Sequence, residues 1–329
     1  MLQRNLGNNG PAVSALGLGC MGMSDFYGPA DEAESIATIH AALDAGINLI
    51  DTGDFYGMGH NEMLIRRALE GRRDQAFIAV KFGALRGPDL SFHGLDMRPA
   101  AVKNFLAYSL RRLGTDYIDL YQPCRVDPKV PIEDTIGAIA DMVKAGYVRQ
   151  IGISEASAET LRRASAVHRI AALQIEYAIV SRSIESEILP AARELGVSIT
   201  AYGVLSRGLL SGWRPSGATD FRAHLPRFTG ENFEKNQKIV NTLREIAAGK
   251  NASPAQIAIA WVLSRGTDII PLVGSRRRTQ LEEAVRALDL KLTDQELHDL
   301  ETAIPADAIA GTRYDAQQMS LLDSERKAG

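Results

Sequence analysis

The sequence has few cysteines, no long apolar run and no strong excess of charge. Only Cys20 and Cys124 occur among 329 residues, which excludes a scaffold of several disulfides and suits a reducing compartment. No run approaches the roughly 18 apolar residues that span a bilayer, and MLQRNLGNNG contains no apolar signal core. The net charge of −3 provides no basic field for nucleic acid or an anionic membrane. We therefore expect a cytoplasmic protein that binds a small molecule, with no nucleic-acid, membrane or metal partner.

Helix-like segments that end at glycine and lead directly into short apolar runs recur along the chain. Within residues 32–44 the apolar side chains fall on one helical face, and Gly46 then suits a left-handed cap. The same punctuation recurs at Gly146, Gly196 and Gly266. The repeated pattern indicates helix-to-strand units.

Short β-rich runs separated by helical segments lie near residues 16–18, 47–50, 77–80, 117–120, 147–151, 172–175, 197–200 and 269–270. An open, doubly wound sheet is the rival arrangement, but Gly17, Gly19 and Gly22 are followed by a loop-like stretch where its dinucleotide fingerprint would begin a helix. We therefore predict one α/β domain over residues 1–329, a (β/α)8 TIM barrel. It should have an N-terminal β-hairpin, a C-terminal helical extension and a possible flexible tail at about 312–329.

Three polar residues lie where such a barrel places its chemistry, at the C-terminal ends of strands. Asp51 and Lys81 each directly follow an apolar run, and Tyr56 lies in the loop beyond Asp51. Taken singly, these are a helix cap, a surface amine and a packing residue. Together they predict carbonyl reduction, in which hydride reaches carbon and Tyr56 protonates oxygen. Lys81 is expected to favour the phenolate, and Asp51 to hold the ammonium in place.

The chain resembles the aldo-keto reductases over nearly its whole length, in particular bacterial and plant members related to potassium-channel β-subunits. The matching blocks, in family order, are Gly17-Leu18-Gly19-Cys20-Met21-Gly22, Asp51-Thr52-Gly53-Asp54-Phe55-Tyr56-Gly57, Val80-Lys81, Arg125-Val126-Asp127-Pro128, Gly152-Ile153-Ser154 and Gly203-Val204-Leu205-Ser206-Arg207-Gly208. The resemblance implies a (β/α)8 barrel that binds NADPH in an extended pose, and it assigns Asp51, Tyr56 and Lys81 to three positions of the catalytic tetrad.

The fourth tetrad position departs from the pattern, because Cys124 stands where similar proteins have a histidine before the Arg-Val-Asp-Pro run. A thiol is a weak donor with a different shape, so positioning of the carbonyl is affected. Two interpretations remain open. Cys124 is a small apolar filler in a working carbonyl reductase, which we favour, or it marks a shifted substrate or reaction. Thiolate chemistry, promoted by Arg125, is a third option.

The resemblance also implies a cofactor site. Tyr202 is expected to stack on the nicotinamide, Ser154 and Gln174 to bind its carboxamide, and Arg276 to bind the 2′-phosphate that distinguishes NADPH from NADH. Arg207 lies in a pyrophosphate-covering loop, or is a solvent-facing charge. The full predicted set is Gly19, Cys20, Met21, Asp51, Ser154, Gln174, Tyr202, Gly203, Leu205, Ser206, Arg207, Leu209, Gly274, Ser275, Arg276, Gln280 and Glu283.

The substrate is expected to be a small aldehyde or ketone in a mostly apolar pocket. Its predicted lining is Met21, Phe26, Phe55, Phe82 and the segment beyond Thr302. Residues 213–233 form a mobile lid or an oligomer contact, so a homo-oligomer is possible. The function predicted is NADPH-dependent carbonyl reduction. The alternatives are a cofactor-binding regulatory subunit like the potassium-channel β-subunits and a barrel of altered or non-redox chemistry.

Overall fold

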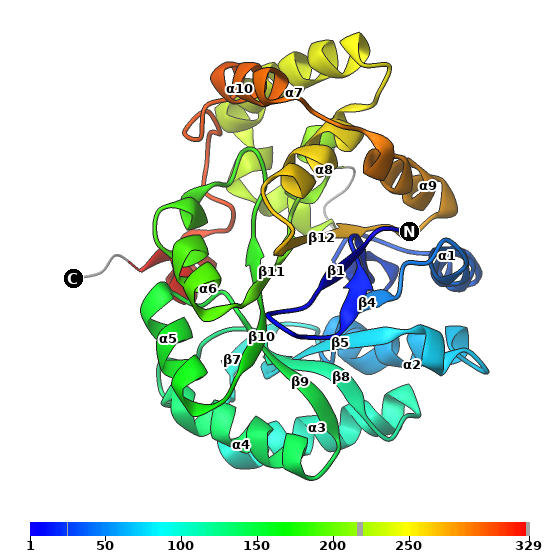
Figure 1. Cartoon of the computed structure of the whole chain (residues 1–329), viewed down its shortest axis with the longest axis vertical. Coiled ribbons are helices and arrows are strands. Elements are labelled where there is room, and N and C mark those ends of the chain that lie inside the picture. The colour runs from blue at the N-terminus through cyan, green and yellow to red at the C-terminus, as the bar shows by residue number, and fades with distance from the viewer. Residues whose placement is uncertain (25, 216–219, 327–329) are drawn as a thin grey trace.

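Eight parallel strands form a closed barrel surrounded by helices in the computed structural model, which describes residues 1–24, 26–215 and 220–326 (Figure 1). Around the barrel the strands follow the order β10-β11-β12-β3-β4-β5-β8-β9. Their bounds are β3 Gly17–Gly19, β4 Leu49–Gly53, β5 Phe77–Phe82, β8 Ile118–Pro123, β9 Val148–Ser154, β10 Ile170–Glu176, β11 Ser198–Tyr202 and β12 Ile269–Gly274. The closed parallel sheet confirms the predicted (β/α)8 barrel and excludes the open sheet.

Helices follow the strands as the alternating pattern predicted, with two helices between β11 and β12. The helices are α1 Glu32–Asp44, α2 His60–Ala68, α3 Pro99–Leu113, α4 Ile132–Lys144, α5 Ala158–Val167, α6 Ile188–Leu195, α7 Gly230–Gly249, α8 Pro254–Ser264 and α9 Arg278–Arg286. The C-terminal extension contributes α10 Asp294–Ala303 and α11 Ala316–Ser320. No helix in the described part of the chain is long and apolar enough to cross a membrane.

Most of the local signals that predicted these elements operate as expected, although α8 ends at Ser264 with Arg265 as its cap, ahead of the expected Gly266. The backbone at Gly46, Gly146 and Gly196 has positive φ values of 83°, 85° and 68°, the left-handed conformation in which glycine carries no Cβ penalty. Ser253 begins α8 through a capping box with Gln256, because each side chain accepts a backbone N–H of the other residue. Sequence therefore sets where most helices begin and end.

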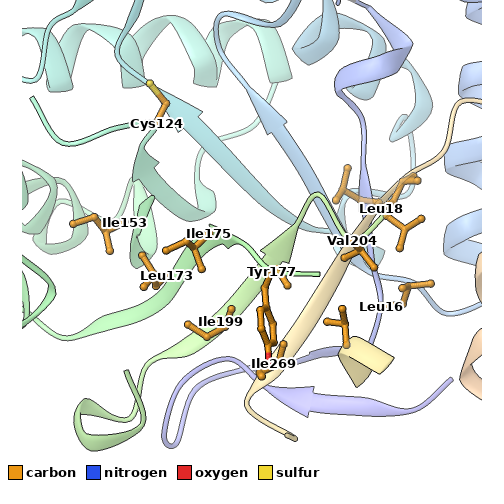
Figure 2. Packing of buried hydrophobic residues seen from close by; sticks show 14 of the residues in the cluster. Leu16, Leu18, Cys124, Ile153, Leu173, Ile175, Tyr177, Ile199, Val204 and Ile269 are labelled. Atoms are coloured by element: carbon orange, nitrogen blue, oxygen red, sulfur yellow. The ribbon is translucent and has the colours of Figure 1, made fainter. Parts of the chain in front are cut away.

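An antiparallel hairpin closes the N-terminal end of the barrel. Its strands, β1 Gln3–Asn5 and β2 Ala12–Ser14, confirm the predicted hairpin. Leu6 and Val13 are fully buried and pack with barrel residues that include Leu49 and Ile270. The barrel interior is filled by apolar side chains such as Ala79 and Leu120. Leu173 and Ile199, seen in Figure 2, belong instead to the larger apolar cluster between the strands and the surrounding helices. A filled interior and a covered N-terminal end leave the opposite end of the barrel for a site.

Strand ends differ from the sequence expectation in one consistent way. Asp51 and Lys81 were expected to follow their strands, but they are the third residue of β4 and the fifth of β5. A short hairpin also follows β5, with strands β6 Ala84–Arg86 and β7 Phe92–Leu95. Apolar runs underestimate the strands, because hydrogen bonding continues along the backbone past the last apolar side chain.

The segment beyond residue 312, for which the sequence suggested a flexible tail, packs against the barrel as far as residue 326. Arg313 is 6% exposed and pairs with the fully buried Glu155, and the backbone N–H of Ser324 donates to the Glu155 carbonyl. The last part of the expected tail, 327–329, lies outside the described residues. So do 216–219, which belong to the stretch expected as a lid or oligomer contact; that stretch also includes the start of α7.

Candidate active site

A cavity of about 550 Å³ opens at the C-terminal ends of the strands. Its walls combine polar residues of the strand ends with apolar residues of the loops, including Met21, Phe26 and Phe55. The C-terminal extension contributes Tyr314 and Leu321. A concave site of this size, with few polar groups among apolar ones, suits a small organic ligand.

Asp51 and Lys81 form a buried ion pair in the cavity wall. The Lys81 ammonium donates to Asp51 Oδ1 at 2.6 Å, and the amide nitrogen of Gln174 donates to Asp51 Oδ2 at 2.7 Å. Asp51 is 6% exposed and Lys81 4%. Each oxygen of the Asp51 carboxylate therefore accepts a hydrogen bond, and this carboxylate neutralises the positive charge of Lys81.

Tyr56 also lines the cavity, in the loop after β4, and is 6% exposed. Its hydroxyl makes no hydrogen bond to the described residues, and the Lys81 ammonium lies 5.2 Å from its ring centroid. Burial, together with the charge of Asp51, raises the pKa of Tyr56 well above its ordinary value. The pKa of Tyr56 is therefore shifted away from the phenolate, opposite to the direction expected from Lys81. The ammonium of Lys81 pairs with Asp51 instead.

Cys124 follows β8 directly and lines the same cavity, 3% exposed. Burial raises the pKa of its thiol to about 12, and the charge of Arg125 only partly opposes that shift. A thiol with this pKa is un-ionised at neutral pH. Thiolate chemistry therefore has no support in the site, and a small apolar filler agrees with the geometry.

The end of the cavity near β9 and β10 offers groups that a planar amide needs. Ser154 Oγ is buried without a hydrogen-bond partner among the described residues. Gln174 uses its amide nitrogen on Asp51, which leaves its carbonyl oxygen to accept a hydrogen bond. Ser275 Oγ, beside β12, is likewise buried without a described partner. These unpaired groups fit a nicotinamide carboxamide at one end and further polar atoms of a dinucleotide at the other.

Most of the predicted cofactor residues meet along this cavity. Those that line it are Gly19, Met21, Asp51, Ser154, Gln174, Tyr202, Gly203, Leu205, Arg207, Gly274, Ser275, Arg276 and Gln280. Four predicted residues are not among the lining residues. Cys20 is fully buried beneath β3, Leu209 belongs to a separate apolar cluster, Ser206 hydrogen-bonds Arg227, and Glu283 accepts from Gln256 through its backbone carbonyl.

Arg276 holds the loop that follows β3. One of its terminal nitrogens donates to the carbonyl oxygens of Tyr27 at 3.0 Å and Pro29 at 3.1 Å. Gln280 in turn accepts from the Arg276 backbone N–H at 3.1 Å. Arg276 also lines the cavity, so the residue both shapes the loop and brings a positive charge to the cavity wall.

Glu155 ties the C-terminal extension to the cavity wall at Tyr202. Its carboxylate receives both terminal nitrogens of Arg313, at 2.9 and 2.8 Å, and the hydroxyl of Tyr202 at 2.7 Å. Burial alone would raise the pKa of Glu155, but the Arg313 guanidinium outweighs it and holds that pKa below its usual range. Tyr202 is thus fixed by its hydroxyl, with its ring at the cavity wall.

Arg207 is not the solvent-facing charge that the sequence allowed, because its side chain is 6% exposed. It lies 3.1 Å from Glu176 and stacks on the ring of Tyr314, 4.3 Å from the centroid. Phe82, predicted to line the substrate pocket, is also placed differently. It is fully buried and stacks on Tyr121 outside the cavity lining, with ring centroids 4.2 Å apart.

Several lining residues were not predicted individually. Tyr314 lies in the segment beyond Thr302 that was expected to line the pocket. Trp213 and Phe221 lie in the stretch 213–233 that was expected as a lid or oligomer contact. Leu90 and Phe92, from the β6–β7 hairpin, had no signal in the sequence. These residues adjoin the proposed catalytic residues only through folding, so no spacing pattern relates them. Within the described residues no cluster of His, Cys, Asp and Glu could hold a metal ion.

The comparisons with known proteins agree with this geometry. The model of the Aldo/keto reductase family matches residues 15–305. "Probable aldo-keto reductase 1" from Glycine max is 42% identical over 318 residues, which cover 94% of this chain and 90% of the relative. The glycerol dehydrogenase of Gluconobacter oxydans has a TM-score of 0.83 and 32% identity, covering 94% and 98% of the two chains. An aldo-keto reductase of Bacillus halodurans, in its holo form, has a TM-score of 0.78 and 29% identity, covering 93% and 97%.

Proposed function

Because the chain belongs to the aldo/keto reductase family and is therefore an oxidoreductase, we propose that it reduces small aldehydes and ketones with NADPH, using Tyr56 as proton donor. The observation that carries the proposal is that Tyr56, whose hydroxyl makes no hydrogen bond to the described residues, lines a cavity in which Asp51 and Lys81 form a buried pair. The coarser class, a nicotinamide-using reductase, comes with the family. The proton donor, the cofactor preference and the substrates are the proposal.

Tyr56 is suited to donate because it stays protonated. Its raised pKa keeps the phenol un-ionised at neutral pH, yet an alkoxide formed from a carbonyl is a stronger base and takes the proton. The ammonium of Lys81, 5.2 Å from the ring centroid, stabilises the phenolate that remains. Asp51 fixes that ammonium in place. A bound NADPH would supply hydride to the carbonyl carbon.

The residues that would hold the cofactor are those of the strand ends. Ser154 and Gln174 offer a donor and an acceptor for the carboxamide, and Tyr202 offers a ring held by Glu155. Arg276 is proposed to bind the 2′-phosphate with the donors that it does not use on the loop after β3. Two free, buried cysteines fit a reducing compartment, so we place the protein in the cytoplasm.

Neutral Cys124 supports the filler interpretation, and the unpaired Ser154 and Ser275 hydroxyls support a bound dinucleotide. A regulatory subunit would also bind NADPH, so NADPH binding does not distinguish it from an enzyme. Steady NADPH oxidation in the presence of a panel of aldehydes distinguishes an enzyme from a regulatory subunit. A barrel of non-redox chemistry would bind no nicotinamide at all.

The decisive variant is Tyr56→Phe, assayed for NADPH oxidation with an aldehyde. We expect turnover to fall by more than about 100-fold while NADPH still binds, because general acid catalysis contributes about 10²- to 10⁴-fold. Tyr108→Phe is the matched control, since that tyrosine is 57% exposed. If Tyr56→Phe retains more than about one hundredth of the activity, another group donates the proton.

Cofactor preference is tested by Arg276→Gln. We expect NADPH affinity to fall by about 10-fold or more and NADH affinity to change little, because the lost charge meets only the 2′-phosphate. Quenching of tryptophan fluorescence reports binding, since Trp213 lies in the cavity wall. Equal affinities of the unaltered protein for NADPH and NADH would contradict the NADPH assignment.

A further inference from the structure

Arg125 is a partly buried cation with neutral partners. It follows Cys124 at the end of β8 and lines the cavity. Its two terminal nitrogens donate to the Cys124 carbonyl oxygen at 2.6 Å and to the Tyr314 hydroxyl at 3.4 Å. No carboxylate of the described residues lies within the 4.0 Å of an ion pair. A guanidinium has five N–H donors, so donors remain for something in the cavity.

The nearest carboxylates are already committed. Glu155 is held by Arg313 through two hydrogen bonds. Glu176 is shared by Arg207 at 3.1 Å and Arg227 at 3.0 Å, with Arg313 at 3.7 Å. Glu155 and Glu176 therefore pair with arginines other than Arg125, and the positive charge of Arg125 remains unpaired in the cavity wall. A charge that is partly removed from water without a counter-ion costs free energy, and a ligand anion relieves that cost.

The pKa of Tyr314 indicates that positive charge exceeds negative charge around its hydroxyl. Burial alone would raise the pKa of Tyr314, but Arg207 and then Arg125 outweigh it and lower that pKa below its ordinary value. The ring lies 4.3 Å from the Arg207 guanidinium and 5.8 Å from that of Arg125. The environment thus favours an anion at this point, independently of the hydrogen-bond count.

The position of Arg125 separates it from the proposed phosphate site. In the barrel order, β8 lies four strands from β12 in a ring of eight, so Arg125 and Arg276 start from opposite sides of the mouth. Arg125 is instead near the chemistry, because its charge acts on the pKa values of both Cys124 and Tyr56. An anion held there belongs to the molecule whose carbonyl faces Tyr56.

We propose that Arg125 binds a carboxylate of the substrate, so that the preferred substrates are small carbonyl compounds carrying a carboxylate a short distance from the aldehyde or ketone. This rests on the proposed function. Arg125 also replaces the orientation that a histidine at 124 would supply, because a charge-assisted bond to one end of the substrate fixes the other end near Tyr56. The apolar walls around Phe26 and Phe55 strengthen that bond by excluding water.

The test compares 4-carboxybenzaldehyde with the neutral 4-formylbenzamide, using NADPH and four proteins: the unaltered chain, Arg125→Gln, Arg125→Lys and Arg163→Gln. We expect Arg125→Gln to raise KM for the carboxylate about 10- to 100-fold and to change KM for the amide less than about threefold. Arg125→Lys should fall between, since it keeps the charge but not the planar fork. Arg163→Gln removes one charge at the surface, from an exposed pair with Glu133, and should behave as the unaltered chain.

A binding measurement keeps the two proposals distinguishable. Calorimetry with benzoate and benzamide, in the presence of NADP⁺, reports anion binding without turnover, and circular dichroism confirms that each variant is folded. If no carbonyl is reduced but benzoate binds through Arg125, the proposed function fails and the anion site stands. If Arg125→Gln raises KM for both aldehydes equally, or weakens the binding of NADPH instead, the substrate-anion proposal is overturned.

Discussion

The two sides of the cavity differ in whether their charged side chains are paired with an opposite charge. On the β4–β5 side, Asp51 and Lys81 neutralise each other at 2.6 Å. On the side formed by β8 and the C-terminal extension, Arg125 has neutral partners, and the acids nearby are used by other arginines. Asp51 and Lys81 are buried, whereas Arg125 is only partly buried and lines the cavity. A balanced pair holds a catalytic group in place, whereas an unbalanced cation attracts a ligand.

Breaking the balanced side is expected to have the largest effect. Lys81→Met leaves the Asp51 carboxylate buried with Gln174 as its remaining partner, and should lower the free energy of unfolding by about 3 to 5 kcal/mol, as well as removing most activity. Urea unfolding followed by tryptophan fluorescence measures the loss. The double variant Asp51→Asn/Lys81→Met should regain part of the stability, since no charge is left unpaired. A single-variant loss below about 1 kcal/mol would contradict the paired description.

Acid should weaken the arginine-rich side next. Glu176 has a pKa of about 2: burial would raise it, but Arg207 and then Arg227 lower it further. A carboxyl with a folded pKa below its unfolded value near 4.3 stabilises the protein above that value, and the contribution is lost as pH falls towards 2. The advantage of the unaltered chain over Glu176→Gln should shrink by on the order of 3 kcal/mol across this range. A pH-independent difference would mean that the pKa of Glu176 is the same in the folded and unfolded states, which would contradict its pairing with the arginines.

Releasing the C-terminal extension should cost somewhat less. Arg313→Met removes the bidentate partner of Glu155. The Glu155 carboxylate still accepts hydrogen bonds from the hydroxyls of Tyr202 and Ser324. We therefore expect the free energy of unfolding to fall by about 1.5 to 3 kcal/mol. Arg326→Met is the control, because that arginine is half exposed and pairs with Asp323 at 3.4 Å; its loss should stay below about 1 kcal/mol. Equal losses in the two variants would show that the buried pair does not anchor the extension.

The smallest effect is expected at Cys124, between the two sides. Cys124→Ala should change kcat/KM less than about threefold, because a neutral thiol is a weak donor and serves here as filler. Steady-state kinetics with a reducible aldehyde measures this ratio. A large gain on Cys124→His would instead show that the natural residue limits carbonyl positioning.

The proposed catalytic residues could be picked out from the sequence because each lies at a strand end, or in the loop just beyond one, with a local signal. Asp51 and Lys81 directly follow apolar runs, and Tyr56 directly follows Asp54-Phe55 in the loop pattern shared with the family. Their contacts were not readable. The sequence suggested that Lys81 acts on Tyr56, but the structure gives the ammonium to Asp51 and leaves the pKa of Tyr56 raised.

The C-terminal extension was the least predictable part. Residues 313–326 are polar and carry no helical period that would mark a buried role, so a flexible tail was a reasonable expectation. Arg313 nevertheless finds Glu155, 158 positions away in the chain, and Tyr314 reaches Arg125 and Arg207. Contacts of this range leave no local periodicity in the sequence.

By itself, the sequence determined the repeating strand and helix units, the glycines that end helices, and the polar residues at the strand ends. These depend on interactions within a few residues, such as caps and apolar faces. Tertiary structure alone decided which charges are neutralised and which remain available in the cavity. That balance depends on distances of 3 to 4 Å between residues far apart in the chain, as with Arg125, whose site is defined by what Glu155 and Glu176 already bind.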